Sequence, residues 1–213
     1  MALLNDEIRG QVAEMLADLP HAVKLVTFTQ PEDCPYCDLI VELMQEVAST
    51  SPQVTAEVYD FTIHKDKVAE YKIDKAPATA IIGAKDYGMR FFGIPANYEF
   101  GTLLHGIQLA GQGHALELDE ATKGFLALLE KPVHIQVFVT PTCPYCPRAA
   151  TLAFEMATES DLVRADVIEA QEFMELSNAY NVMGVPLNVI NDKERVEGAA
   201  PAYMIVEAIK KSI

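Results

Sequence analysis

The chain is short of positive charge, of cysteine and of long apolar runs. It carries 16 Lys and Arg against 31 Asp and Glu, for a formal net charge of −15. A nucleic-acid-binding face needs clustered Lys and Arg, so nucleic acid is not expected as a partner. No apolar run reaches the 18 residues that suggest a membrane span. The excess of acidic residues is interpreted as a solubilising surface.

The N-terminus also lacks the marks of a secretory signal, because residues 1–7 contain neither a basic region nor an apolar core. We therefore expect a cytoplasmic protein. In that compartment a Cys-x-x-Cys motif serves redox or metal chemistry more often than it serves as a structural staple. Half of the residues are apolar and low-complexity runs are missing, which is typical of a compact globular protein.

All four cysteines lie in one motif that occurs twice. Cys34-Pro35-Tyr36-Cys37 and Cys143-Pro144-Tyr145-Cys146 are identical. Each is followed by a proline, Pro77 or Pro186, that lies 43 residues after the first cysteine of the motif. The motif and the proline are thus both repeated at an offset of 109 residues. Two thiol pairs with matched prolines indicate two copies of one redox site.

The repeat predicts two domains of about 100 residues. We place them at residues 1–113 and 114–213, with the boundary in the polar, glycine-containing segment 111–114. Hydrophobic patterning predicts the order α-β-α-β-α-β-β-α in each half. The predicted helices and strands are helix 4–19, strand 23–28, helix 38–48, strand 54–59, a helix before residue 71, strands 79–82 and 89–92, helix 97–109; then helix 119–130 with Asp119 as its N-cap, strand 133–139, helix 148–158, strand 162–168, a helix before residue 180, strands 187–190 and 195–197, and helix 202–211.

Each cysteine motif follows a strand and precedes an apolar helix, so we expect the cysteines at a helix start. Residues at i and i+3 share one helix face, and two such cysteines can close a small disulfide ring. Pro35 and Pro144 suit the first helical position, where a fixed φ fits and no amide donor is wasted.

The helix start also predicts which cysteine attacks. Free N–H groups and the helix dipole favour a thiolate there and lower the thiol pKa from about 8.5. Cys34 and Cys143 are therefore the predicted nucleophiles. Cys37 and Cys146, one turn deeper, are the predicted resolving residues.

Two other uses of the motif compete with redox catalysis. Zinc is held by four thiolates from two such pairs, but the repeat places the pairs in different domains and zinc leaves the matched prolines unexplained. A structural disulfide across four residues closes too small a loop to stabilise much.

At this point the chain resembles a known family. A βαβαββα unit with Cys-Pro-Tyr-Cys after its first strand and an X-Pro before its third is similar to the thioredoxin and glutaredoxin fold. Two such units in one chain resemble the glutaredoxin-like protein disulfide oxidoreductases of archaea and thermophilic bacteria. The resemblance covers nearly the whole chain. It implies an α/β fold of two tandem thioredoxin-like domains, each with a central mixed sheet flanked by helices.

The family resemblance also implies substrate-binding residues. In the family the X-Pro bond is cis and faces the cysteines, and the backbone before the proline pairs with the substrate chain. The alternative is an ordinary trans proline that ends a loop. The tyrosines of the motifs flank the substrate sulfur, with simple packing as the alternative. The residues that take these roles here are Ala76, Pro77, Val185, Pro186, Tyr36 and Tyr145.

The two sites differ in the charge beside the cysteines. Glu32, Asp33 and Asp38 flank the first motif, whereas Arg148 follows the second. Nearby carboxylates raise a thiol pKa, so Cys143 is predicted to be the more acidic thiol, unless solvent screens these side chains. Lys75 is expected to offset Asp33 in part.

The loops before the prolines differ as well. Residues 74–76 are charged, while residues 183–185 are apolar. The second site is therefore expected to accommodate segments of unfolded protein better than the first.

The proton acceptor of thioredoxins is missing. Thioredoxins carry a buried aspartate six residues before the first cysteine, where this chain has Phe28 and Val137. Glu57 and Asp166, each 20 residues before its proline, are candidates for the role, with an exposed strand carboxylate as the alternative. The Gly-Gly-x-Asp stretch that binds glutathione in glutaredoxins is also unmatched, so glutathione is not expected as an obligate cofactor.

We therefore predict an enzyme that reduces, forms or reshuffles protein disulfides. It needs no prosthetic group and no metal, because each cysteine pair carries two electrons. The expected partners are protein disulfides and a thioredoxin-reductase-like electron donor. The alternatives are an electron carrier for a peroxiredoxin, as in the N-terminal part of flavoprotein peroxiredoxin reductases, and a chaperone or binding module that does not use its thiols.

Overall fold

The computed structural model describes residues 3–213, so the first two residues of the N-terminal segment considered as a secretory signal lie outside the described residues. The order α-β-α-β-α-β-β-α is confirmed in both halves, with ends within a few residues of the predicted ones. The elements are α1 (Asp6–Met15), β1 (Val23–Thr29), α2 (Cys37–Ala48), β2 (Val54–Asp60), α3 (Lys65–Glu70), β3 (Ala78–Ile82), β4 (Asp86–Phe92), α4 (Tyr98–Gln112), α5 (Glu120–Ala127), β5 (Val133–Val139), α6 (Cys146–Glu159), β6 (Val163–Glu169), α7 (Met174–Ala179), β7 (Leu187–Ile190), β8 (Glu194–Glu197) and α8 (Ala202–Ser212).

The helix that leads each half begins at a side-chain cap. Asp119 Oδ1 accepts a hydrogen bond from the Thr122 amide at 2.9 Å, which confirms Asp119 as the N-cap of α5. Asn5 caps α1 in the same way, through the Ile8 amide at 2.9 Å. These oxygens satisfy amide groups that have no partner inside the first helical turn.

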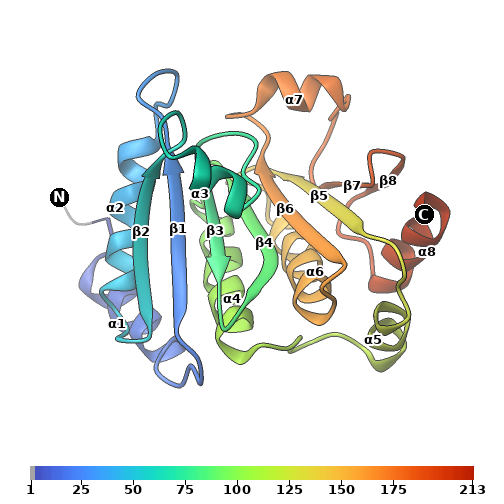
Figure 1. Cartoon of the computed structure of the whole chain (residues 1–213), viewed down its shortest axis with the longest axis horizontal. Coiled ribbons are helices and arrows are strands. Elements are labelled where there is room, and N and C mark those ends of the chain that lie inside the picture. The colour runs from blue at the N-terminus through green and yellow to red at the C-terminus, as the bar shows by residue number, and fades with distance from the viewer. Residues whose placement is uncertain (1–2) are drawn as a thin grey trace.

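All eight strands form one sheet, in the order β2-β1-β3-β4-β6-β5-β7-β8 (Figure 1). Within each half the first two strands pair in parallel, and the last two are added by antiparallel pairing. The halves are joined by parallel pairing of β4 with β6, in which residues 89–92 lie opposite residues 165–168. The predicted α/β class and the tandem thioredoxin-like arrangement are confirmed.

The helices cover the two faces of this sheet unequally. One hydrophobic cluster draws on α1, α2, α4, α5, α6 and α8 and runs without a break through both halves. A smaller cluster on the opposite face includes residues of α3 and α7. Figure 1 shows α4 and α6 side by side behind the strands, where they cover the pairing of β4 with β6.

The predicted boundary near residues 111–114 falls where α4 ends, at Gly113 in the left-handed conformation. The division into domains 1–113 and 114–213 stays a prediction, because the halves share both a sheet and a core. Between residues 3 and 213, every helix is too short or too polar to cross a membrane.

Close packing where the halves meet gives a testable consequence for stability. A side chain at Gly106 of α4 would place its Cβ 2.8 Å from Ile81 Cδ1 and 3.2 Å from the Phe154 ring of α6. We expect Gly106→Leu to lower the free energy of unfolding by about 1–3 kcal/mol through overpacking. Urea denaturation measures this change.

Gly101 provides the matched control, because it lies on the same helix, is exposed, and has no atom within 4 Å of an added Cβ. Gly101→Leu removes a helix-interior glycine without a clash, so it should be neutral or stabilise by up to about 1 kcal/mol. Equal losses in the two variants would contradict the packing argument.

Candidate functional site

Both cysteine motifs lie at the same edge of the sheet, after the carboxyl ends of the parallel strands β1 and β5. Each pair is closed as a disulfide, with Cα–Cα distances of 5.4 Å for Cys34–Cys37 and 5.5 Å for Cys143–Cys146. β1 and β5 are four strand positions apart, which is about 19 Å at the usual spacing. The four sulfurs therefore form two separate sites and do not converge on one centre.

The helices begin at the second cysteine of each motif. α2 starts at Cys37 and α6 at Cys146, and each of these amides donates to the carbonyl of the first cysteine, at 3.3 and 3.4 Å. Pro35 and Pro144 thus lie in a turn before the helix, and their predicted place at the first helical position is wrong. The turn places the first cysteine just ahead of the free N–H groups of the helix.

Both halves contain a cis X-Pro bond. Ala76-Pro77 and Val185-Pro186 are both cis, as the family resemblance implied. The carbonyls of the two prolines accept hydrogen bonds from the Gly93 and Gly198 amides at 3.0 and 2.8 Å. Both glycines have positive φ, 91° and 78°, which side chains rarely adopt.

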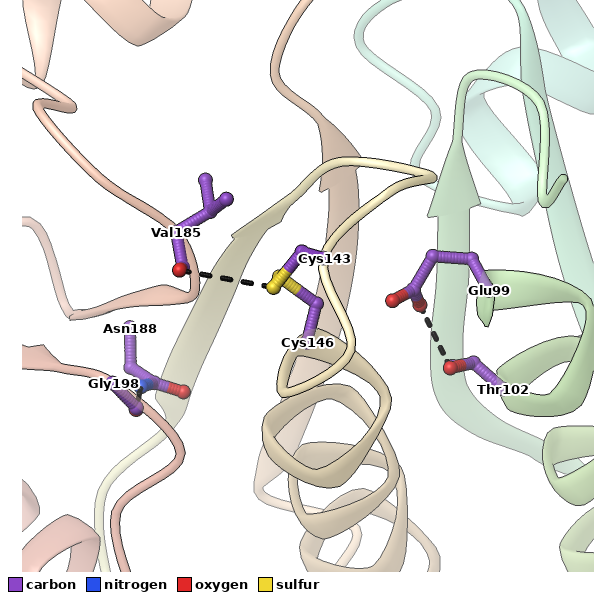
Figure 2. The surroundings of a disulfide bond; sticks show 7 residues. All are labelled: Glu99, Thr102, Cys143, Cys146, Val185, Asn188 and Gly198. Carbon is purple, nitrogen blue, oxygen red and sulfur yellow. Dashed lines mark hydrogen bonds between the residues drawn. A yellow bond between two sulfur atoms is a disulfide. The ribbon is translucent and has the colours of Figure 1, made fainter. Parts of the chain in front are cut away.

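At the second site the cis-proline loop touches the disulfide. Cys143 Sγ lies 3.7 Å from the Val185 carbonyl oxygen (Figure 2). Asn188 fixes the strands below this loop by donating to the Val196 and Gly198 carbonyls at 2.9 and 3.2 Å. Cys143 is 8% exposed and Cys146 is fully buried. A partner sulfur can therefore reach Cys143 first, which fits the predicted order of attack and resolution.

The second cis-proline loop is open to solvent. Met183 is 95% exposed, Gly184 is exposed and Val185 is half-buried. A groove of about 300 Å³ runs from these residues along Pro186 to Gly198. An extended polypeptide lying in this groove would pass the Val185 backbone next to the disulfide.

The first cis-proline loop is covered instead. Ala76 is 9% exposed, and its neighbours Asp74 and Lys75 line a groove together with Glu172 and Phe173 of the second half. Lys75 Nζ lies 2.8 Å from Asp74 Oδ1 and 3.8 Å from the centre of the Phe92 ring. The positive charge of Lys75 is thus paired with Asp74, so Lys75 does little to offset the negative charge of Asp33.

The rest of the first site is polar and exposed. Cys34 is half-exposed, and Gln30 N approaches Cys37 Sγ at 3.4 Å. The three acidic neighbours of the motif, Glu32, Asp33 and Asp38, are all exposed. Solvent screens exposed charges, so these three carboxylates affect the Cys34 thiol less than buried carboxylates would.

The motif tyrosines point away from the core. Tyr36 is 43% exposed and Tyr145 is 71% exposed. This exposure disfavours simple packing and suits the predicted contact with a substrate, which stays a prediction.

The two predicted proton acceptors project from the other face of the sheet. Glu57 pairs with Lys24 at 2.9 Å, and Asp166 is bound by His134 and Arg164 at 2.7 and 2.8 Å. These partners hold the pKa of both carboxyls below the usual range, against the effect of burial. The structure therefore does not bring Glu57 or Asp166 to the cysteines, because strand residues alternate between faces and these two share the face of α3 and α7.

A different carboxyl group, missed in the sequence, lies at the second site. Glu99 is fully buried in the first turn of α4, and Figure 2 shows its carboxyl group turned toward Cys143–Cys146. Burial raises its pKa to about 7. No local pattern marks Glu99, because its place beside the second disulfide depends on contact between the halves, such as the hydrogen bond from the Tyr98 amide to the Pro141 carbonyl at 3.3 Å.

Comparison with known proteins supports this geometry. A thioredoxin domain model matches residues 133–211. A thioredoxin of Methanocaldococcus jannaschii is 38% identical over 82 residues, which is 96% of that protein and 38% of this chain. The chain belongs to the thioredoxin family. With two disulfide-forming Cys-x-x-Cys sites, it is a thioredoxin-like disulfide oxidoreductase.

Two further matches cover both halves of this thioredoxin-family protein. A protein disulfide oxidoreductase from Aeropyrum pernix superposes with a TM-score of 0.89 at 28% identity, over 97% of this chain and 92% of that chain. The N-terminal domain of the alkylhydroperoxide reductase AhpF from Enterococcus faecalis superposes with a TM-score of 0.88 at 25% identity, over 97% and 99%.

AhpF also matches in sequence. The Staphylococcus epidermidis protein is 24% identical over 193 residues, or 90% of this chain. The chain spans only about a third of the length of that relative, since the match covers 35% of it.

The two glycines beside the cis-prolines offer a matched pair of substitutions. A Cβ at Gly93 would lie 2.7 Å from Glu169 Cβ and 2.7 Å from Glu172 Oε1, whereas Gly198 has open space around it. Both alanine variants carry the positive-φ penalty of about 1–2 kcal/mol. Gly93→Ala should lose about 1–3 kcal/mol more in unfolding free energy through the added clash. Equal losses of unfolding free energy in urea titrations would contradict the close packing of Glu169 and Glu172 against Gly93.

Proposed function

We propose that the chain is a protein disulfide oxidoreductase that exchanges dithiols and disulfides with polypeptides, and that its C-terminal site is the principal one. The observation that carries the proposal is the contact of 3.7 Å between Cys143 Sγ and the carbonyl of Val185, a residue that lines an open groove. A polypeptide pairing with the Val185 backbone would add an extended strand beside the sulfur. The overall match to the Aeropyrum pernix enzyme supports this proposal.

The exchange follows from the order of exposure. The Cys143 thiolate attacks a substrate disulfide, forming a mixed disulfide and releasing one substrate thiolate. The Cys146 thiolate then attacks Cys143 Sγ, closes the Cys143–Cys146 disulfide and releases the second substrate thiolate. Two electrons pass to the substrate, and a thioredoxin-reductase-like donor returns the pair to the dithiol. The reverse sequence forms a substrate disulfide.

The first site takes a lesser part with polypeptides in this proposal. Ala76 is buried and its loop faces the second half, so an extended chain lacks a free backbone to pair with. Cys34 is nevertheless more exposed than Cys143, which suits exchange with small disulfides or with a dedicated partner.

Insulin disulfide reduction tests the proposal. With excess reductant, Cys143→Ser should lose most of the activity of the unsubstituted chain, because it removes the nucleophile beside the open groove. Cys34→Ser should retain most of it and serves as the matched control. Similar losses in both variants would contradict the assignment of the C-terminal site, and an inactive parent would contradict polypeptide exchange altogether.

The match to AhpF favours a second candidate, an electron carrier to a peroxide-reducing partner such as a peroxiredoxin. In this case the reduced chain should pass electrons to such a peroxidase faster than to insulin. Parallel assays with hydroperoxide and with insulin, at equal concentrations of the chain, decide between the two. Faster insulin reduction would reject the carrier as the main function.

A further inference from the structure

We propose that the groove between α2 and the edge strand β2 docks a positively charged, extended polypeptide segment of an exchange partner beside the Cys34–Cys37 disulfide. The inference rests on the dithiol–disulfide exchange proposed above and names the class of partner that the first site takes. It gives this site a docking surface of its own, in place of the first cis-proline loop, where Ala76 is buried.

The groove reaches the first site from the side of β2. It has a volume of about 480 Å³, and its walls come from α2, from β2 and from residues 29–31, which lead from β1 to the motif. Cys37 is one of the lining residues, and Gln30 N approaches its Sγ at 3.4 Å. All lining residues lie between positions 29 and 60, so the groove is separate from the cis-proline loop at residues 74–77.

β2 offers an unpaired backbone along this groove. It pairs with β1 on one side, and within residues 3–213 its other side has no strand partner (Figure 1). The end of β2 lies beside the start of the motif loop, since the Phe61 amide donates to the Thr29 carbonyl at 2.7 Å. An edge strand is a template for an added strand. A segment that pairs with β2 would therefore end next to the half-exposed Cys34.

The groove also contains apolar surface for such a segment. Val58 of β2 is 40% exposed, and Val41 of α2 is half-buried in the same lining. Side chains of an extended segment alternate between its two faces. Every second side chain can thus pack on these valines, while the others remain free to meet charges at the rim.

The charged side chains of the groove all have one sign. Asp38, Glu42 and Asp60 line it, and Glu32 and Asp33 add two exposed carboxylates just before Cys34. Within residues 3–213, none of these five carboxyl groups forms an ion pair. Their negative charge is therefore available to a cationic partner.

Asp60 is fixed in its ionised form at the end of β2. Its Oδ1 accepts hydrogen bonds from the Thr62 hydroxyl and amide, both at 2.6 Å, and from the Ile63 amide at 3.2 Å. The Thr62 hydroxyl contributes most to a pKa of Asp60 that lies below the usual range. The negative charge at this end of the groove is thus held in place at neutral pH.

The groove beside the second site differs in charge. Arg195 and Glu197 line it and offset one another, and Arg148 follows the second motif. A cationic segment is therefore attracted to the first groove more than to the second. Complementary charge of this kind acts mainly on partner choice and on the rate of encounter.

The exchange itself uses the first pair of cysteines. The Cys34 thiolate attacks a disulfide in the docked segment, so a mixed disulfide forms and one partner thiolate leaves. The Cys37 thiolate then attacks Cys34 Sγ, closes the Cys34–Cys37 disulfide and releases the second partner thiolate. Two electrons pass to the partner, and a dithiol partner reverses the sequence.

Two synthetic peptides of equal length test the charge of the partner. Each carries one cysteine as its nitrothiobenzoate disulfide among alternating valines, and the other positions hold lysine in one peptide and glutamate in the other. Attack on the peptide sulfur releases nitrothiobenzoate, whose absorbance gives the second-order rate constant. The first site is measured in the Cys143→Ser/Cys146→Ser chain and the second in the Cys34→Ser/Cys37→Ser chain, both reduced beforehand.

At low ionic strength, the ratio of the lysine-peptide rate to the glutamate-peptide rate should be about 10-fold higher at the first site than at the second, the lower end of electrostatic steering. Comparison of the two chains cancels the intrinsic reactivity of each peptide and the net charge of −15, which both chains share. The difference between the sites should shrink as added salt shortens the Debye length to about 8 Å.

Glu42→Lys in the first-site chain should remove most of the preference for lysine, because it places a cation in the groove and leaves both cysteines intact. Glu130→Lys is the matched control, with the same change in net charge. Glu130 is exposed and precedes β5, at the end of the parallel strands opposite to the motifs. This variant should keep the preference.

Equal ratios at the two sites would overturn the inference, and that comparison needs no substitution in the groove. So would a first-site chain that reacts with neither peptide, or a preference that Glu130→Lys abolishes and Glu42→Lys does not. The cysteamine–nitrothiobenzoate disulfide offers an ammonium group without a backbone. If it showed the same site preference as the lysine peptide, local charge would suffice and polypeptide docking would be refuted. A second-site chain that reacts with neither peptide would instead refute the exchange function proposed above.

Discussion

The parallel pairing of β4 with β6 is the constraint on which the rest of the molecule depends. It converts two four-stranded units into one eight-stranded sheet. Parallel strands are normally buried on both faces, and here α4 and α6 cover one face while Phe92 and Phe173 meet on the other. The close approach at Gly106 follows from the same pairing, because α4 must fit between β3 and α6.

The junction also makes two chemically identical motifs unequal. In the strand order, the first cis-proline loop precedes β3, which only β4 separates from the other half, while the second precedes β7, which lies on the outer side of its half. Ala76 is buried, and its neighbours Asp74 and Lys75 line a groove with residues of the second half, whereas Val185 is half-buried beside exposed residues. Differences in local charge, which the sequence shows, are weakened by exposure of the acidic side chains. Access to the backbone beside the cis-proline is thus the stronger source of asymmetry.

Features set by local chemistry were predictable from the sequence. The repeated motif, the element order and the Asp119 cap depend on short-range spacing, and all three were predicted correctly. Pro35 and Pro144 do not take the predicted first helical position, since the turn closed by each disulfide precedes the helix, which begins at Cys37 or Cys146. The proton acceptor was sought on the strands, at Glu57 and Asp166, and both project from the opposite face. The sequence does not reveal Glu99, because its position depends on contact between the halves, such as that of Tyr98 with Pro141, which spacing along one half does not show.

Glu99 illustrates why a costly group can persist in a well-packed core. Raising a carboxyl pKa from 4.5 to about 7 corresponds to about 3 kcal/mol against the ionised form. Because the pKa is raised in the folded chain, the penalty is absent below about pH 4.5, where the carboxyl group is neutral in the folded and the unfolded chain. Stability is then lost as pH rises through about 7 and the buried group ionises. A glutamine or a hydrophobic residue would remove this penalty. The carboxyl group instead keeps one buried oxygen without a hydrogen-bond partner, on the side of the Cys143–Cys146 disulfide (Figure 2).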